Sequence, residues 1–376
     1  MKVLIVYASA GSGHKKAAEA VYEAFGKDKT GCEVKLADIL DYTNPVVKYA
    51  YQALYLFTIK HIPLVWGLIF KITNNRRFYK ITIPLRLLIE RLNSLRFQGY
   101  LKKERFDVII STHFYASAIA GILKRDKAIN SKLITVVTDY LVHAFWLTAE
   151  NDYFVVASSK AREELLRDKV ADEKIKVLGI PVGEKFLLKK DSARIKEKLN
   201  LRPKKITMLI MGGGFGVGPY EYLLKELSPF SEKVELIFVC GYNIGIYKKL
   251  ELLSTELKTD AKIFKYVDNV DELMEVSDII ITKAGGITVS EALVKGVPML
   301  VIRPIPGQEE LNAMLMQVLK VLKSTASKEE ALIFLKTVIK EPDILEKMKE
   351  NAGRAARPKA AEELVNLARR IERDYK

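Results

Sequence analysis

The chain has 376 residues and carries 61 Lys and Arg against 46 Asp and Glu, a formal net charge of +15. Its 49% hydrophobic and 28% charged residues are typical of a globular protein and exclude general disorder, and the length predicts two domains. Cys32 and Cys240 are too few for a disulfide framework or a cysteine-based zinc site, and they fit a reducing cytoplasm. The first residues lack the cleavage pattern of a signal peptide.

The first half begins with a strand at residues 2–8, a glycine-rich turn at 9–14 and a helix at 15–25. Further short apolar runs predict strands at 108–112, 133–138 and 153–157. Strands that alternate with helices in this way are typical of a parallel, doubly wound sheet.

An insertion at residues 45–105 interrupts this half and holds twelve Lys and Arg against two acidic residues, so it supplies +10 of the net charge. The run LYLFTIKHIPLVWGLIF is too apolar for a nucleic-acid surface, and a merely solvated insertion would not need its exposed Trp, Phe and Leu. Apolar groups mixed with cations predict contact with an anionic membrane surface, and no nucleic acid. The candidate membrane-binding residues are Trp66, Phe70, Arg76, Arg77 and Lys80.

Residues 49–70 are long enough to cross a bilayer. However, Lys60, His61 and Pro63 lie near the centre of the run, and a central lysine costs roughly 2.5–3.5 kcal/mol on insertion scales. The pattern therefore favours broken helices that lie in the membrane interface over a spanning helix.

The second half repeats the pattern, with strands expected at 206–211, 235–240, 263–266, 278–282 and 299–302. The run MLMQVLKVLKSTASKEE after Asn312 predicts a continuous helix that ends at Ser324. We therefore expect an α/β protein with two Rossmann-like domains that face a cleft, 1–182 and 183–357. Residues 358–376 are expected to form a helix that packs back on the first domain.

In doubly wound sheets, ligands bind beyond the carboxyl ends of the strands, and glycine there lets a phosphate approach the backbone. The amides of Gly285 and Gly286 could face a phosphate, while the Glu291 carboxylate could accept hydrogen bonds from a ribose diol. Gln308, Glu309 and Asn312 follow the next strand and could bond sugar hydroxyls. The alternatives are tight strand–helix packing at the glycines, and a first-turn acid at Glu291 that complements the helix dipole.

Six motifs in order carry a family resemblance: GSGHKKAAEA, THFYAS, VTDYLVHAFW, GGGFGVGP, ITKAGGITVSEA and PIPGQEELNA. From Met1 to about Asn312 the chain resembles the monogalactosyldiacylglycerol synthases and processive diacylglycerol glucosyltransferases. These are inverting glycosyltransferases of the GT-B fold, related to the peptidoglycan N-acetylglucosaminyl transferase. Ala284 and Ala144 stand where the family usually has proline, and the family usually has a turn and a short strand after Asn312.

The resemblance implies transfer of a hexose, glucose or galactose, from a UDP-sugar to diacylglycerol or a related lipid, with a β bond in the product. Gly214 and its neighbours would lie at the diphosphate, residues 264–267 near uracil, Glu291 on the ribose, and Gln308 and Glu309 at the donor sugar. The full implied donor site is Gly213, Gly214, Phe215, Gly216, Tyr266, Val267, Lys283, Gly285, Gly286, Thr288, Glu291, Gln308, Glu309 and Asn312. The implied acceptor side holds Gly13, His113, His143 and Trp146.

Inversion needs a base for the acceptor hydroxyl, and the candidates are His14 and Asp139. We expect His14 on a flexible glycine loop, where it either takes the proton or holds a diphosphate or acceptor oxygen. Asp139 follows a strand and could be the base, orient the acceptor or cap a helix. His143 would share its face if that stretch is helical.

No Asp-x-Asp pair stands at a strand end, so we expect no cofactor and no essential metal, with loop amides and the helix dipole stabilising the leaving UDP. The expected location is the cytoplasmic face of the cell membrane, as a peripheral protein. The alternatives are N-acetylglucosaminyl transfer to a polyprenyl diphosphate-linked acceptor, a two-domain UDP-sugar epimerase, and a membrane-binding scaffold without activity.

Overall fold

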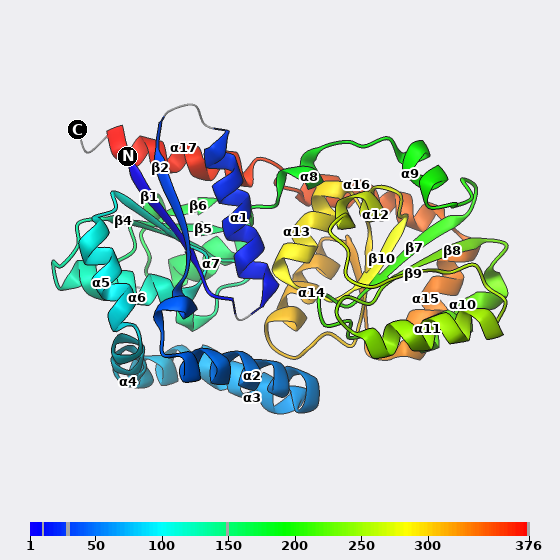
Figure 1. Cartoon of the computed structure of the whole chain (residues 1–376), viewed down its shortest axis with the longest axis horizontal. Coiled ribbons are helices and arrows are strands. Elements are labelled where there is room, and N and C mark those ends of the chain that lie inside the picture. The colour runs from blue at the N-terminus through cyan, green and yellow to red at the C-terminus, as the bar shows by residue number, and fades with distance from the viewer. Residues whose placement is uncertain (10, 28–30, 148–149, 374–376) are drawn as a thin grey trace.

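The computed structural model describes residues 1–9, 11–27, 31–147 and 150–373, and shows two parallel sheets side by side, each covered by helices (Figure 1). In the first sheet the strand order is β2-β1-β3-β4-β5-β6. Its strands are β1 (Lys2–Tyr7), β2 (Glu33–Asp38), β3 (Val108–Ser111), β4 (Lys132–Val136), β5 (Tyr153–Val156) and β6 (Ile175–Val177). The helices around it are α1 (Ser12–Gly26), α5 (Leu95–Glu104), α6 (Phe114–Arg125), α7 (Ser159–Arg167) and α17 (Ala360–Arg373).

The second sheet has the order β12-β11-β10-β7-β8-β9. Its strands are β7 (Ile206–Met211), β8 (Val234–Val239), β9 (Lys262–Phe264), β10 (Ile279–Thr282), β11 (Met299–Ile302) and β12 (Leu322–Thr325). The helices that accompany it are α8 (Glu184–Leu187), α9 (Ser192–Lys198), α10 (Tyr220–Leu227), α11 (Ile244–Glu256), α12 (Val270–Glu275), α13 (Gly286–Lys295), α14 (Gln308–Val318), α15 (Lys328–Lys340) and α16 (Asp343–Ala355). The predicted pair of parallel, doubly wound sheets is confirmed.

The expected continuous helix after Asn312 is wrong. Helix α14 ends at Val318, and Lys320 adopts a left-handed conformation with φ 57°, which turns the chain back toward the sheet. The chain then forms β12, which pairs in parallel with β11 and buries Leu322 and Thr325. Burial at the sheet edge therefore overrides the helical spacing of the sequence.

The insertion forms a row of helices below the first sheet: α2 (Pro45–His61), α3 (Pro63–Asn74) and α4 (Arg76–Asn93), followed by α5 (Figure 1). Pro63 begins α3, because proline suits the first turn of a helix and cannot continue α2. The Asn75 side chain caps α4 by accepting hydrogen bonds from the main-chain N–H groups of Arg77 and Phe78. Within the described part of the chain, no helix is long and apolar enough to cross a membrane.

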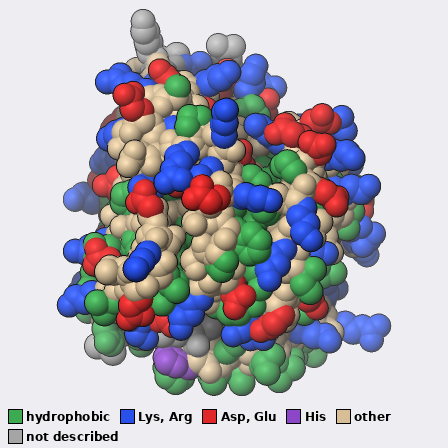
Figure 2. Space-filling view, turned by 90° about the vertical axis from the view of Figure 1, so that its right-hand side faces the viewer, with side chains coloured by type: hydrophobic (Ala, Val, Ile, Leu, Met, Phe, Trp, Pro, Cys, Tyr) green, Lys and Arg blue, Asp and Glu red, His purple; other side chains and the backbone are tan. Residues whose placement is uncertain are grey.

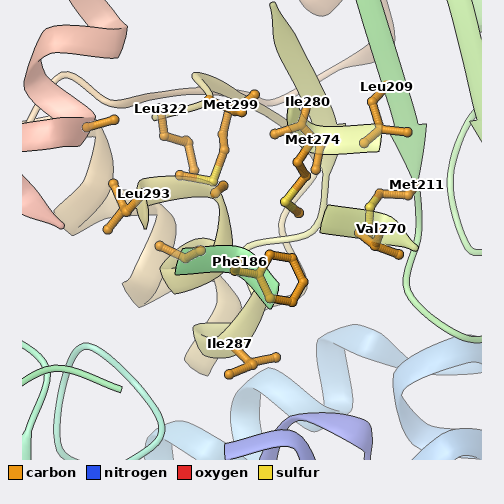
Figure 3. Close-up of a cluster of buried hydrophobic side chains, with 14 of the residues drawn as sticks. Phe186, Leu209, Met211, Val270, Met274, Ile280, Ile287, Leu293, Met299 and Leu322 are labelled. Carbon is orange, nitrogen blue, oxygen red and sulfur yellow. The ribbon is translucent and has the colours of Figure 1, made fainter. Parts of the chain in front are cut away.

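The core of the second domain extends to the junction with the first. Figure 3 shows Leu209, Met274, Met299 and Leu322 packed below the second sheet, with Ile287 at the edge of the cluster nearest to ribbons of the first domain. Helix α17 crosses back and buries Leu364 and neighbouring side chains against α1 and the first sheet. Residues 374–376, at the end of the predicted C-terminal segment, lie outside the described residues.

Candidate active site

The two domains meet where α1 and α13 follow the carboxyl ends of β1 and β10. Each helix has a glycine in its first turn that lies close to the other domain. A Cβ atom on Gly286 would lie 2.0 Å from the Thr138 carbonyl oxygen, and one on Gly13 would lie 3.5 Å from Cγ2 of Ile287. Because glycine has no Cβ, position 286 can lie this close to the Thr138 carbonyl. The starts of α1 and α13 therefore meet at one place.

His14 belongs to the first turn of α1, so the expected flexible loop is wrong. Its Nδ1 lies 2.7 Å from the Thr112 carbonyl oxygen and 2.9 Å from Oγ1 of Thr138. A carbonyl oxygen only accepts, so Nδ1 carries the proton and Nε2 is the basic nitrogen. Burial lowers the pKa of His14 to about 4, although the hydrogen bond to Thr112 acts in the opposite direction.

Three residues expected to touch the acceptor have structural partners instead. Nδ1 of His113 accepts the main-chain N–H of Tyr115, and Nδ1 of His143 accepts that of Phe145, so each imidazole caps a helical turn. His113 is 1% exposed and Trp146 is 2% exposed, which removes both from direct contact with a substrate in this arrangement. The His113 ring lies edge-on to the His14 ring with 4.6 Å between centroids, so it packs against His14.

Asp139 follows β4 and reaches the second domain. Its Oδ1 accepts a hydrogen bond of 3.2 Å from Nδ2 of Asn312, and burial raises the pKa of Asp139 to about 6 despite that bond. No described helix begins at Asp139, because the next helical turn starts at Ala144 and is capped by His143. The sequence allowed Asp139 to cap a helix or to share a helical face with His143. In the structure it does neither.

Asn312 is fully engaged between the domains, which the sequence did not predict. Besides Asp139, its Nδ2 donates to the Ala284 carbonyl at 3.0 Å, and its Oδ1 accepts the main-chain N–H of Tyr140 at 2.9 Å. The Tyr140 hydroxyl also lies 2.8 Å from Oγ of Ser290. In this arrangement Asn312 joins the domains rather than presenting its amide to a sugar.

Two further acidic residues of the second domain have unsatisfied oxygens at this junction. Glu291 is 2% exposed, its Oε1 lies 3.8 Å from Nζ of Lys16, and its buried Oε2 has no hydrogen-bond partner among the described residues. Burial raises the pKa of Glu291 to about 7. Glu309 lies 3.8 Å from Nζ of Lys283, its Oε2 is likewise unsatisfied, and burial raises its pKa. Buried carboxylates without partners are costly, and a ligand with hydroxyl groups would satisfy them.

Beside them, α13 begins at Gly286 without a side-chain cap, and no acidic residue stands in its first turn. Its N–H groups and dipole therefore remain suited to an anion, with the half-buried Thr288 in the same turn. Gln308 is the first residue of α14 and stands next to Glu309.

The glycine-rich loop after β7 interlocks with the turn after β8. Gly213 and Gly216 have positive φ angles, and a Cβ on Gly216 would lie 2.1 Å from the Cys240 carbonyl oxygen. The Tyr242 N–H donates to the Gly214 carbonyl, and the Tyr242 ring stacks on Tyr266 at 4.6 Å. Phe215, Tyr242 and Tyr266 are exposed, whereas Val267 packs on the core. Helix α10 begins at Tyr220, several residues after this glycine loop, so the loop does not run directly into the helix.

Sequence reasoning missed Tyr242, Tyr140 and Lys16. The Gly241 turn directly after a buried strand could have indicated Tyr242, but no sequence signal marks a contact between domains. A cavity of about 660 Å³ lies at the opposite end of the second sheet, lined by Ile206, Asp278 and Pro298 among others, and is remote from these side chains.

Comparisons with known proteins agree with this architecture. Residues 14–182 match the family model described as monogalactosyldiacylglycerol (MGDG) synthase, and residues 207–368 match the glycosyltransferase family 28 C-terminal domain. The chain is 30% identical over 355 residues to the processive diacylglycerol beta-glucosyltransferase of Bacillus subtilis (strain 168), covering 93% of this chain and 90% of the relative.

Solved structures share the fold. MurG of Acinetobacter baumannii has a TM-score of 0.65 at 20% identity and covers 98% of this chain, with 99% of its own chain matched. The UDP-GlcNAc 2-epimerase of Neisseria meningitidis bound to UDP-GlcNAc has a TM-score of 0.62 at 16% identity, with coverage of 97% and 99%.

The two sheets and the matched domains define an enzyme, a glycosyltransferase of the GT-B fold. The chain belongs to the family of the monogalactosyldiacylglycerol synthases and processive diacylglycerol β-glucosyltransferases, which confirms the resemblance and the fold class predicted from its motifs.

Proposed function

We propose that the protein transfers glucose or galactose from a UDP-sugar to diacylglycerol at a membrane surface and forms a β-glycosyl glycolipid. The names of the relatives support the glycolipid product and the acceptor. The observation that carries the proposal is the junction of the domains. There α1, which carries His14, contacts α13, which carries Glu291, and Asp139 bonds to Asn312 of α14, which also carries Glu309.

The donor would bind along the second domain. The glycine loop of Gly213, Gly214 and Gly216 and the start of α13 offer N–H groups for the diphosphate, and Glu291 has an oxygen available to a ribose diol. Uracil would lie near Tyr266, and the hexose would reach Glu309. Tyr242 extends this surface as an aromatic partner of Tyr266.

His14 is the better supported of the two candidate bases, because Nδ1 is held by a carbonyl and Nε2 is the nitrogen able to accept a proton. In the transfer step, the acceptor hydroxyl oxygen bonds to the anomeric carbon while its proton passes to Nε2. The bond from that carbon to the diphosphate oxygen breaks at the same time, and UDP leaves with the electron pair. Asp139, bonded to Asn312, would orient the acceptor hydroxyl.

The charge that develops on UDP would be stabilised by loop N–H groups, by the dipole of α13 and by Lys283. No group of three or more His, Cys, Asp or Glu in the described ranges has the arrangement of a metal site. We propose transfer without an essential metal or cofactor, because the loop N–H groups, the dipole of α13 and Lys283 can take over the stabilisation of the leaving UDP, and we expect activity to persist in EDTA.

The acceptor would come from an anionic membrane on which the helices α2 to α4 dock, which would place the enzyme on the cytoplasmic face as a peripheral protein. Leu64 on α3 and Ile81 on α4 are 80% and 79% exposed, and the exposed cations Arg77 and Lys80 lie on α4 near Ile81. Figure 2, viewed from the side of the second domain, shows hydrophobic side chains gathered at the lower edge, where Figure 1 places α2 and α3.

Arg76 has a different role from the one expected. Its guanidinium pairs with Asp168 at 2.8 Å and donates to the Val142 carbonyl at 3.0 Å, so it fixes α4 to the first domain. Phe70 is half-buried against His143, with 4.5 Å between ring centroids. The exposed cations Arg77 and Lys80 are the better candidates for contact with lipid headgroups.

The decisive experiment is incubation with radiolabelled UDP-glucose, UDP-galactose and UDP-N-acetylglucosamine and with vesicles that contain diacylglycerol, followed by separation of the lipid products. We expect a labelled β-hexosyl diacylglycerol, formed at least about 100-fold more slowly by His14→Gln. Label only on a polyprenyl diphosphate-linked acceptor, or conversion of the UDP-sugar without any lipid, would contradict the proposal.

A further inference from the structure

Helix α3 has two different faces. Leu64, Leu68 and Ile72 are 80%, 58% and 41% exposed, and with Val65 and Ile69 they form an outer face that is apolar but unburied. The residues between them point inward at helical spacing and are half-buried: Pro63, Trp66, Gly67, Phe70, Thr73 and Asn74. The same helix therefore presents one apolar face to the surroundings and another to the protein.

The inner face of α3 contacts the first domain next to Asp139. Nδ1 of His143 accepts the Phe145 N–H, so its Nε2 carries the proton and donates to the Phe70 carbonyl at 3.3 Å. Oγ1 of Thr73 lies 3.2 Å from the same nitrogen. These bonds hold α3 against the segment that leads from Asp139 to His143.

The inner face also contacts the second domain, at the loop before α14. A Cβ atom on Gly67 would lie 2.4 Å from Cβ of Pro306, and one on Gly307 would lie 2.9 Å from Cγ of Phe70. Gly307 has a φ of 103°, a conformation that other residues rarely adopt, and Pro306 has a fixed φ of its own. The two glycines thus permit a close crossing of α3 over a stiff loop.

That loop leads directly into Gln308 and Glu309, the residues assigned above to the donor sugar. A shift of α3 relative to the first domain would move Pro306 and Gly307, because the atoms are in contact and interiors transmit such displacements. A membrane on the outer face would hold α3 in place through Leu64 and Leu68.

We propose that α3 couples the membrane surface to the donor site, with Gly67 and Phe70 as positioning residues for the loop that carries Gln308 and Glu309. The inference rests on the proposed function, because it requires a membrane on the outer face and a UDP-hexose at the second domain. Linkage then requires that membrane binding tighten donor binding and that donor tighten membrane binding by the same factor.

The matched test compares two glycines inside helices. Gly67→Ala adds a methyl group that collides with Pro306, whereas Gly99→Ala in α5 adds the same group where nothing lies within 4 Å. Both changes favour the helix itself, so a loss of fold is not expected from either. Phe70→Ala is the second variant, because it removes the ring from Gly307 without adding bulk.

Each protein is titrated with UDP-glucose and with UDP-galactose, alone and with vesicles of phosphatidylcholine and phosphatidylglycerol that lack diacylglycerol, so that no transfer occurs. For the unmodified protein and Gly99→Ala we expect the vesicles to lower the donor dissociation constant by about five-fold or more. In Gly67→Ala and Phe70→Ala the vesicles should still bind but no longer change donor affinity. In turnover assays both variants should raise the donor KM more than they lower kcat.

The outcomes separate the two ideas. If the unmodified protein binds donor and vesicles independently of each other, the coupling is wrong while the proposed function stands. If Gly67→Ala and Phe70→Ala keep the full vesicle effect, α3 is not the connection. If the unmodified protein binds no vesicles or no UDP-hexose, the proposed function and the coupling both fail.

Discussion

At the level of single residues, the junction holds carboxyl groups whose pKa values are raised by burial: about 7 for Glu291, about 6 for Asp139, and an upward shift for Glu309. Strongly perturbed pKa values cluster at functional sites. Glu291 and Glu309 are the clearest cases, because each has one buried carboxylate oxygen without a hydrogen-bond partner among the described residues.

Glu291→Gln should therefore stabilise the unliganded protein at high pH. The Glu291 pKa is higher in the folded state than its ordinary 4.5, so the stability linked to it is fully present below pH 4.5 and is lost as the pH rises through about 7. Glutamine does not titrate, so at pH 8 the variant should gain up to about 3 kcal/mol in free energy of unfolding, and almost nothing near pH 4.5. Urea unfolding at both pH values measures this.

The same substitution should weaken UDP binding about ten-fold or more, because a charge-assisted hydrogen bond to the ribose is lost. Glu346→Gln on the exposed side of α16 is the control and should change neither property. Equal stability of Glu291→Gln and the unmodified protein at pH 8 would show that Glu291 is not a strained buried carboxylate.

The choice of base predicts a pH profile for kcat at saturating substrates. A base works only when unprotonated, so activity falls as the pH drops below its pKa. With His14 as the base, the acidic limb should lie near pH 4 and should persist in Asp139→Asn, while His14→Gln should lower kcat about 10²–10⁴-fold. A limb near pH 6 that disappears in Asp139→Asn would instead assign the base to Asp139.

At the level of elements, the strands that the sequence missed share one position: β2, β6 and β12 are all sheet edges. Central strands are buried on both faces and appear as continuous apolar runs such as ITMLIM of β7, whereas the edge strand EVKLAD of β2 is mixed in polarity. The apolar residues of β12 are spaced like those of a helix, so the sequence suggested a helix. Only pairing with β11 makes this segment a strand.

The candidate site divides in a similar way. The glycine turns and His14, Asp139 and Glu291 all come shortly after strands. Because strand ends can be located from the sequence, the approach of these residues to one junction could be predicted. The caps formed by His113 and His143 and the bonds of Asn312 depend on contacts between distant segments. No spacing in the sequence encodes such contacts.

The helix α4 allows a test of membrane docking by charge. Arg77→Glu combined with Lys80→Glu removes two exposed cations, each worth about 1 kcal/mol near an anionic surface, so binding to phosphatidylglycerol-containing vesicles should weaken at least about 30-fold at low salt. The difference should shrink at high salt because surface charges are screened. Arg76 is left unchanged, since glutamate there would face Asp168.

Sedimentation with vesicles measures the loss, and Lys258→Glu with Lys323→Glu gives the same charge change at exposed positions of the second domain. That control should bind vesicles like the unmodified protein. Equal binding of all proteins to neutral and anionic vesicles would count against docking through α4.

At the level of the whole molecule, the two domains are closed on each other at the start of α13. A Cβ atom on Gly286, at the start of α13, would lie 2.0 Å from the Thr138 carbonyl oxygen. Asn312 holds this arrangement through its hydrogen bonds with Tyr140 and Asp139 of the first domain. The described arrangement is therefore a closed one at this point.

Asn312→Ala should shift the molecule toward an open arrangement. It leaves the Tyr140 N–H and the Ala284 carbonyl without partners when the domains are closed, and each costs about 1–3 kcal/mol if it stays buried, so opening to water becomes favourable. Small-angle scattering should show a larger radius of gyration for this variant. Asn351→Ala, whose amide donates to Lys320 within the second domain, should leave the radius unchanged. An unchanged radius for Asn312→Ala would mean that other contacts, such as α1 with α13, keep the domains closed.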